Sequence, residues 1–210
     1  MTRSWIFDFD GTLINSEALI RKTFIKITKK FAPHRLDFAR NVLIGPPLKE
    51  TSAQILGSEQ VNLLDNFINN FIESHDQEIL IHTQAYENTN ETLNNFFQMG
   101  HKMAIATNKR KMPTLKIINH LGWEKFFLII ECSDSEIKIR DKSKMIQSII
   151  NKDNDFKKGF FVGDTLGDAS ASSYHNLKFI KAKYGYGEKQ DWESVDIFQI
   201  IENFKDLAEI

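Results

Sequence analysis

The spacing of apolar residues changes along the chain, and each change predicts a different kind of element. A short apolar run of strand formers, Trp5 to Phe7, stops at two aspartates and a glycine, which is typical of a buried strand that ends in a turn. Apolar residues then return at helical spacing, with proline or glycine between the segments. They predict helices over 15–31, 36–43, 49–56 and 61–72. This stretch contains no convincing strand pattern, so we expect an all-helical insertion.

In the second part of the chain, short apolar runs typical of strands alternate with apolar residues at helical spacing. Helices are expected over 91–98, 113–121, 142–150 and 168–174, and strands over 103–106, 126–130, 159–162 and 178–182. Strands that alternate with helices predict parallel βαβ units. The sequence therefore predicts an α/β protein with a doubly wound, Rossmann-like parallel sheet. We assign the core domain to residues 1–14 and 85–210 and the inserted helical cap domain to residues 15–84.

Composition excludes several classes of partner. The 210 residues carry 27 Lys and Arg against 28 Asp and Glu, with no basic block, so we expect no nucleic-acid partner. No apolar run is long enough to span a bilayer, so we expect no membrane partner. The single cysteine, Cys132, excludes an internal disulfide, and no secretory segment is evident, so a cytoplasmic location is expected. Nothing in the sequence indicates the oligomeric state.

Candidate chemistry lies where the expected strands end. Asp8 and Asp10 follow the first strand and, being two residues apart, point to the same side of an extended backbone. Thr107 follows the second strand, and Asp164 and Asp168 follow a later one. Parallel strands bring their carboxyl ends to one edge of the sheet, so these side chains should converge.

The residue types suit phosphoryl transfer through a phosphorylated aspartate. Asp8 is the candidate nucleophile, and Asp10 is the candidate general acid and base. Asp164 and Asp8 can hold Mg²⁺, with Asp168 behind them or bound through water. All four aspartates, Asp8, Asp10, Asp164 and Asp168, are therefore candidates for the metal site.

Three polar residues complete the candidate site. Thr107 and the backbone amide of Asn108 would hydrogen-bond the phosphoryl oxygens, and a lysine would neutralise their charge. We favour Lys142, which comes just before a helix, over Lys144 in its first turn. Taken alone, each residue also fits an ordinary turn, helix cap or solvated surface. These simpler interpretations do not explain why all of them occur in this order along one edge.

These motifs resemble those of the haloacid dehalogenase superfamily of phosphotransferases. The matching residues are Asp8-Phe9-Asp10-Gly11-Thr12, then Thr107, Lys142 and the loop Gly163-Asp164-Thr165-Leu166-Gly167-Asp168. The resemblance implies a substrate-binding role for Thr12 and matches the small helical cap type of the family. It departs from the common pattern at Ser143, where the family lysine is often followed by proline.

Finer details resemble the phosphoglycolate phosphatase-like branch of that superfamily. They are Ile44-Gly45-Pro46-Pro47-Leu48 in the cap, Thr107-Asn108-Lys109 after the second strand, and Tyr184-Gly185-Tyr186-Gly187 near the end. In that branch a cap loop helps to choose the substrate, so the resemblance implies that Gly45, Pro46, Pro47 and Leu48 contact it. The same four residues also fit a plain loop between helices. Lys109 stands at a helix entrance, where contact with a leaving group is one interpretation, but a solvated lysine is expected. No histidine is assigned a role.

The function that these observations predict is a Mg²⁺-dependent phosphatase of small phosphomonoesters, similar to phosphoglycolate phosphatases, that works through an aspartyl-phosphate. A phosphomutase of the same fold uses the same core residues and stays open. A non-catalytic phospho-aspartate switch or binding module is less consistent with the presence of both Asp8 and Asp10. A cap of this size suggests gating, with hinges over 13–16 and 83–87, and hence a small phosphorylated metabolite as substrate. Phosphoglycolate, a sugar phosphate, a nucleotide and pyrophosphate all stay open.

Overall fold

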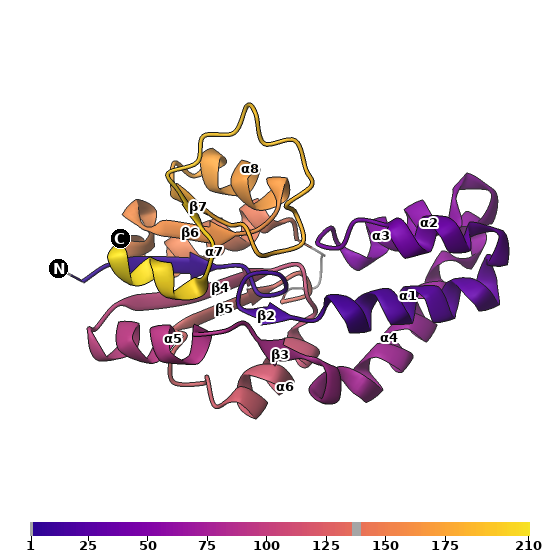
Figure 1. Ribbon diagram of the computed structural model, residues 1–210, viewed down its shortest axis with the longest axis horizontal. Helices are drawn as coiled ribbons and strands as arrows, with labels where there is room; N and C mark the ends of the chain where they lie inside the picture. The colour runs from indigo at the N-terminus through magenta and orange to yellow at the C-terminus, as the bar shows by residue number, and fades with distance from the viewer. Residues whose placement is uncertain (1, 136–139) are drawn as a thin grey trace.

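The computed structural model of the protein describes residues 2–135 and 140–210, and six parallel strands form its central sheet (Figure 1). In spatial order the strands are β5 (Ile129–Cys132), β4 (Lys102–Thr107), β1 (Ser4–Phe7), β6 (Phe160–Gly163), β7 (Lys178–Ala182) and β8 (Gln199–Ile201). Every neighbouring pair in this sheet is parallel. The predicted doubly wound α/β fold is confirmed.

Helices cover both faces of the sheet (Figure 1). One face carries α5 (Thr89–Gln98), α6 (Lys111–Leu121) and the 3-10 helix η4 (Phe204–Glu209), and the other carries α7 (Lys142–Lys152), α8 (Leu166–Tyr174) and the 3-10 helix η3 (Asn154–Lys158). Strand residues alternate between two apolar clusters, because successive side chains of a strand point to opposite faces. Trp5 and Phe7 pack in the first cluster and Ile6 in the second, and all three are fully buried.

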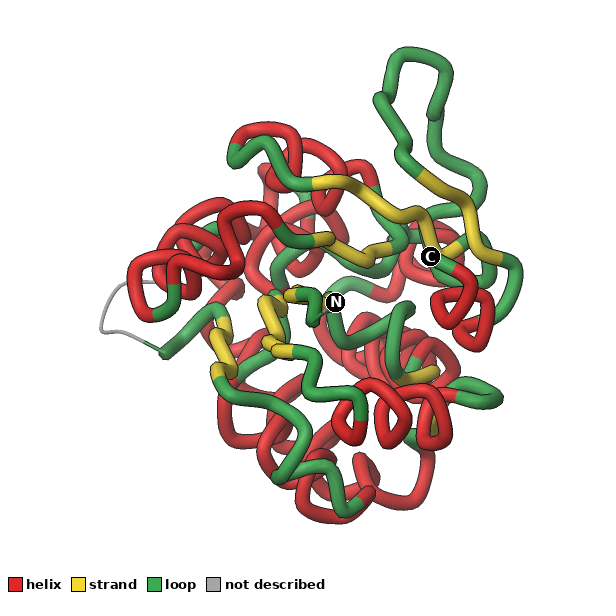
Figure 2. Tube along the Cα trace, turned by 90° about the vertical axis from the view of Figure 1, so that its left-hand side faces the viewer, coloured by secondary structure: helices red, strands yellow, loops and turns green. Residues whose placement is uncertain are grey.

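Four further helices form a separate bundle beyond the carboxyl end of β1 (Figure 1). They are α1 (Glu17–Phe31), α2 (Leu36–Asn41), α3 (Leu48–Leu56) and α4 (Leu64–His82), with 3-10 helices η1 (Pro33–Arg35) and η2 (Ser58–Leu63) between them. We call this bundle the cap. It has an apolar cluster of its own, in which the tilted rings of Phe24 and Phe71 pack with their centroids 4.4 Å apart. Figures 1 and 2 show the start of β1 and the C-terminus at the opposite end of the molecule from the cap.

Two short antiparallel strands join the cap to the core. β2 (Ile14–Asn15) pairs with β3 (Gln84–Ala85), so the chain enters and leaves the cap at one place. The ribbon lies at the positions where the sequence predicts the domain boundaries, and the hinges expected over 13–16 and 83–87 overlap it and stay a prediction. Among the described residues, no helix combines the length and the apolarity that a bilayer crossing requires.

Three sequence predictions differ from the structure. The helix expected over 61–72 is α4, which starts at Leu64 and runs on to His82, because Gln60 has non-helical dihedral angles and residues 58–63 form a 3-10 helix. The strand expected over 126–130 is β5, shifted to Ile129–Cys132, because Phe126 and Phe127 instead pack in the core cluster beside Trp123. Strand β8 was not expected. It has three residues, Gln199–Ile201, and its exposed Ile200 alternates only with Phe198 just before the strand, which is too short a pattern to predict a strand.

Candidate active site

Three neighbouring strands place the candidate residues at one edge of the sheet. β1 lies between β4 and β6, Asp8 follows β1, Thr107 ends β4, and Asp164 follows β6. Residues from distant parts of the sequence therefore meet at the carboxyl edge, as the motif order predicts.

Three carboxylates form a buried cluster at this edge. Asp8, Asp164 and Asp168 each have an oxygen within 4.8 Å of the others, and none is more than 5% exposed. Lys142 reaches the cluster from the start of α7, with its Nζ 2.8 Å from Asp8 Oδ1 and in contact with Asp168 Oδ1. We call these four side chains the acidic cluster.

Burial dominates the electrostatics of the acidic cluster. It raises the pKa of Asp8 to about 7, against the opposing effect of Lys142, and it raises the pKa of Asp164 well above its ordinary value. Burial alone would lower the pKa of Lys142, but the charges of Asp168 and Asp8 outweigh it and raise that pKa. Three carboxylates share one ammonium group, so the cluster has an excess of negative charge. Oxygen donors with such an excess fit a hard divalent cation such as Mg²⁺.

Hydrogen bonds fix the orientation of Asp164. Its Oδ1 accepts a bond from the Thr12 hydroxyl at 3.2 Å, and its Oδ2 accepts one from the Tyr186 backbone N–H at 2.7 Å. Gly11 adopts φ +87°, and a Cβ at Gly11 or at Gly185 would overlap the Asp164 side chain. Thr12 is fully buried, so its observed contact is with Asp164 and not with the open cavity.

Asp168 is held by the first turn of α8. Thr165 caps the helix, and the Asp168 Oδ2 accepts bonds from the Thr165 backbone N–H at 2.9 Å and the Thr165 hydroxyl at 2.7 Å. This capping box leaves Asp168 Oδ1 for Lys142.

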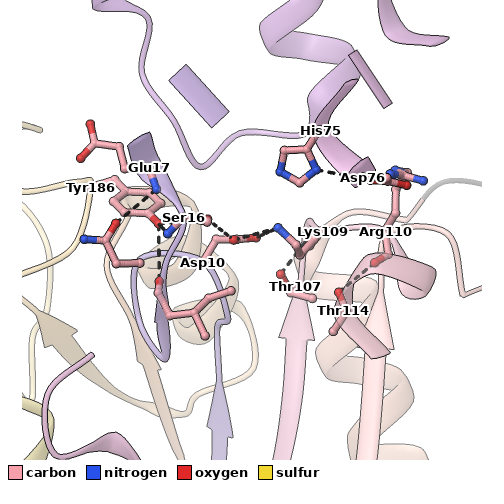
Figure 3. A network of polar contacts seen from close by, with 12 residues as sticks. Asp10, Ser16, Glu17, His75, Asp76, Thr107, Lys109, Arg110, Thr114 and Tyr186 are labelled. Carbon is pink, nitrogen blue, oxygen red and sulfur yellow. Dashed lines mark hydrogen bonds and ion pairs between the residues drawn. The ribbon is translucent and has the colours of Figure 1, made fainter. Parts of the chain in front are cut away.

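Asp10 faces a different set of partners (Figure 3). Its Oδ1 accepts a bond from the Ser16 hydroxyl, and Lys109 Nζ donates to its two oxygens at 3.0 and 3.1 Å. The expectation that Lys109 is solvated is wrong, since its side chain is only 6% exposed. The Asp10 side chain lies outside the three-carboxylate group, so its role as a metal ligand stays a prediction.

Thr107 and Asn108 lie beside this pair and line the same cavity. The Thr107 hydroxyl oxygen accepts the Lys109 backbone N–H at 3.1 Å, which orders the turn after β4. The Asn108 side chain donates to the Gly45 carbonyl at 3.0 Å, so Asn108 joins the core to the cap loop.

A cavity of about 100 Å³ lies between the core edge and the cap. The predicted loop residues Gly45, Pro46 and Leu48 line it together with Asp8 and Asp10. Pro47 lines a second, larger hollow that reaches Lys142 and Asp168. Of the two candidate lysines, Lys142 contacts Asp8, and the Lys144 side chain is 69% exposed and pairs with Asp141.

Sequence reasoning did not find the polar residues that α4 and α6 contribute. His75 of α4 lines the cavity, its Nδ1 lies 3.3 Å from Asp76 Oδ1, and Arg110 donates to Asp76 at 2.6 Å (Figure 3). Burial lowers the pKa of His75, so its ring is neutral at neutral pH. Tyr186 also contributes, because its hydroxyl accepts the Ser16 backbone N–H at 2.8 Å. Of these residues, Tyr186 alone lies in a stretch that stands out in the sequence, Tyr184–Gly187.

Comparison with known proteins identifies the family of the chain. The family model described as haloacid dehalogenase-like hydrolase matches residues 5–182. A pyrophosphatase PpaX from Listeria welshimeri is 27% identical over 79% of this chain and 76% of its own length. A phosphoglycolate phosphatase from Psychrobacter arcticus is 24% identical over 97% of this chain and 93% of its own length.

Solved structures share the fold. A predicted phosphoglycolate phosphatase from Haemophilus somnus superposes with a TM-score of 0.85 at 21% identity, covering 99% of this chain and 97% of its own. A haloacid dehalogenase-like hydrolase from Bacteroides fragilis gives a TM-score of 0.86 at 18% identity, covering 99% of this chain and 100% of its own.

Proposed function

The chain belongs to the haloacid dehalogenase-like hydrolase family, and on that premise we propose that it is a Mg²⁺-dependent phosphatase of small phosphomonoesters that works through an aspartyl-phosphate. The observation that carries this proposal is the separation of the two motif aspartates into different environments. Asp8 sits in the acidic cluster with Lys142, while Asp10 sits at the cavity with Lys109 and Ser16. This difference supports our assignment of the attack on phosphorus to Asp8 and of the proton transfer to Asp10.

In the first step, an Asp8 oxygen attacks phosphorus while the bond from phosphorus to the ester oxygen breaks. Asp10 gives its proton to the departing oxygen, so the alcohol leaves neutral. Lys142 and Thr107 offset the charge on the phosphoryl oxygens. In the second step, water gives a proton to Asp10 and attacks phosphorus, which releases inorganic phosphate and restores the Asp8 carboxylate.

Asp8, Asp164 and Asp168 are the residues that would hold Mg²⁺. When bound, the ion supplies the positive charge that lets a carboxylate approach an anionic phosphate. The fit rests on the three buried carboxylates and their excess of negative charge. Thr12, Tyr186 and the close approach of Gly11 orient Asp164 for this role.

The cap supports a small substrate. The cavity between cap and core is about 100 Å³, and the Asn108–Gly45 bond and the Asp76–Arg110 pair span the two parts. We therefore propose a small phosphorylated metabolite, with the cap loop Gly45–Leu48 and Asn108 helping to choose it. The single thiol, buried at Cys132, is compatible with the cytoplasmic location that we propose.

Hydrolysis of p-nitrophenyl phosphate by the purified protein, with Mg²⁺ and with EDTA, tests the proposal. We expect Mg²⁺-dependent phosphate release that falls at least about a thousandfold in Asp8→Asn, because the covalent route is lost. Asp37→Asn, at a 92% exposed cap position, is the matched control and should keep full activity.

Two other results would change the assignment. A metal-dependent phosphoprotein that forms at Asp8 without turnover would point to the phosphomutase or the phospho-aspartate switch. Absence of both turnover and phosphorylation would contradict the role of Asp8 as nucleophile.

A further inference from the structure

The cavity has two chemically different walls. The core wall carries Asp8, Asp10 and Thr107. The cap wall is built mainly from apolar side chains, namely Ile20, Phe24, Ile44, Leu48 and Phe71. A phosphoryl group bound at Asp8 therefore has its leaving group next to apolar surface, where an anionic group would lose hydration.

The cations of the cavity are already paired. Lys109 donates to both oxygens of Asp10, and Arg110 donates to Asp76. Among the described residues that line the cavity, these are the two with a permanent positive charge. A second phosphate or a carboxylate on the leaving group would have to compete with Asp76 for Arg110 and, whenever Asp10 is ionised, with Asp10 for Lys109. This arrangement disfavours an anionic leaving group.

His75 provides one directed polar contact in the apolar wall. Asp76 accepts a bond from Arg110 and is ionised, because its contacts with His75 and Arg110 outweigh partial burial and hold its pKa at about 2. An ionised carboxylate only accepts hydrogen bonds, so His75 must carry its proton on Nδ1, 3.3 Å from Asp76. In a neutral ring, Nε2 is then a pure acceptor.

The acceptor is held in place and has no partner in the described part of the chain. His75 is 4% exposed, its ring stacks on Phe71 at 5.4 Å with an interplanar angle of 15°, and its Nε2 is buried without a hydrogen bond. Figure 3 shows this nitrogen directed toward the space on the Asp10–Lys109 side of the ring. A buried acceptor of this kind calls for a donor on the ligand.

We propose that the leaving group of the substrate is an uncharged, partly apolar alcohol that carries a second hydroxyl, and that this hydroxyl donates to His75 Nε2. This inference rests on the proposed phosphatase function and deepens it. The proposed substrate differs from pyrophosphate and phosphoglycolate, which appear in the names of the relatives, because the leaving groups of both are anionic.

The test compares kcat/KM over a matched series of alkyl phosphates with leaving groups of two to four carbons. Each length is made with a methyl, a hydroxyl or a carboxylate at its far end, and pyrophosphate is added to the series. At the best length, we expect the hydroxyl-ended ester to exceed the methyl-ended one about tenfold, as one satisfied buried acceptor predicts. Carboxylate-ended esters and pyrophosphate should be the poorest substrates.

His75→Phe isolates the contact, because it keeps a flat ring against Phe71 and removes the acceptor. We expect the ratio of kcat/KM for the hydroxyl-ended ester to that for the methyl-ended ester to fall from about ten to about one, whatever the change in the absolute rates. His82→Phe is the matched control, since His82 lies on the same helix, 47% exposed, and pairs with Glu78 outside the cavity. It should leave all ratios unchanged.

The outcomes separate the two proposals. Turnover that is fastest on pyrophosphate or on a carboxylate-ended ester would overturn this inference while the phosphatase function stands. An equal loss on hydroxyl-ended and methyl-ended esters in His75→Phe would assign His75 a structural role and would also overturn it. No turnover of any ester, p-nitrophenyl phosphate included, would overturn the phosphatase function and this inference with it.

Discussion

The core edge and the cap meet at the same cavity but are stabilised in different ways. The core side holds charges that come from distant segments: Asp8 after β1, Lys142 at the start of α7 and Asp168 in α8. The cap side is a helical bundle with its own apolar cluster, and its residues facing the cavity are mostly apolar. The comparison indicates that the candidate reacting groups are held at the edge of the sheet, whereas the apolar wall of the cavity belongs to a separately packed unit.

The two parts also differ in what a single substitution removes. In the acidic cluster every side chain is buried and Lys142 forms ion pairs with both Asp8 and Asp168, so the loss of Lys142 leaves buried carboxylates uncompensated. Charged pairs that involve the cap are partly exposed, and water can replace a missing partner.

The largest effect is expected from Lys142→Ala, which leaves three buried carboxylates without their cation. We expect it to lower the free energy of unfolding by about 3–5 kcal/mol at neutral pH, measured by urea denaturation, and to abolish activity. Added Mg²⁺ should restore part of the stability. Lys144→Ala, two residues away and exposed, should change stability by less than about 0.5 kcal/mol. Equal effects of the two substitutions would show that the cluster does not depend on Lys142.

The second-largest effect is expected on the free energy of unfolding when the pH is changed and the metal is removed. The pKa of Asp8 is about 7 in the folded protein against an ordinary value of 3.8, so the folded state binds the proton more tightly than the unfolded state. Stability from this group is therefore full below pH 3.8 and is lost as the pH rises through about 7.

Urea denaturation at several pH values between those two limits, in EDTA and in Mg²⁺, measures this loss. In EDTA we expect the free energy of unfolding to fall by a few kcal/mol as the pH rises, and we expect a smaller fall in Mg²⁺, because the ion binds the charged carboxylate. Asp8→Asn should reduce the difference between the two media, because one of the three candidate carboxylate ligands is lost. A wild-type protein with the same pH profile in both would contradict metal binding at the cluster.

The smallest effect is expected where the cap touches the core. Arg110→Gln breaks the pair with Asp76, whose two side chains are each 26% exposed. We expect a change of up to about fivefold, mainly in KM for the phosphatase substrate, because a partly exposed pair contributes up to about 1 kcal/mol. Arg40→Gln removes a similar pair with Asp37 inside the cap and should have no effect on KM. An equal effect from Arg40→Gln would argue against a specific cap-to-core contact.

The sequence predicts the fold best where local patterns and turn residues agree. The alternation of strand-like runs with helical spacing of apolar residues predicts the parallel sheet. The convergence of Asp8, Thr107 and Asp164 follows because the carboxyl ends of parallel strands meet at one edge. Boundaries are predicted less well where tertiary packing decides. Phe126 and Phe127 read as strand residues but are buried beside Trp123, and β5 begins only at Ile129.

The site is predicted to the extent that its residues belong to motifs. Lys109 reads as a surface residue because nothing local indicates that it pairs with Asp10, 99 positions away. His75 and Arg110 have no local signature either, since their meeting at Asp76 depends on how α4 of the cap faces the start of α6. Chemistry that arises between two separately packed parts is the hardest to predict from one sequence.

The two-stranded ribbon has an evolutionary consequence. Ile14 pairs with Ala85 and Asn15 with Gln84, so the inserted segment starts and ends at neighbouring points on the core. The entropic cost of closing such an insert rises only with the logarithm of its length. The length of the inserted segment can therefore change with little entropic cost to the sheet. A change in the insert would alter the apolar wall of the cavity and leave the three carboxylates at the sheet edge in place.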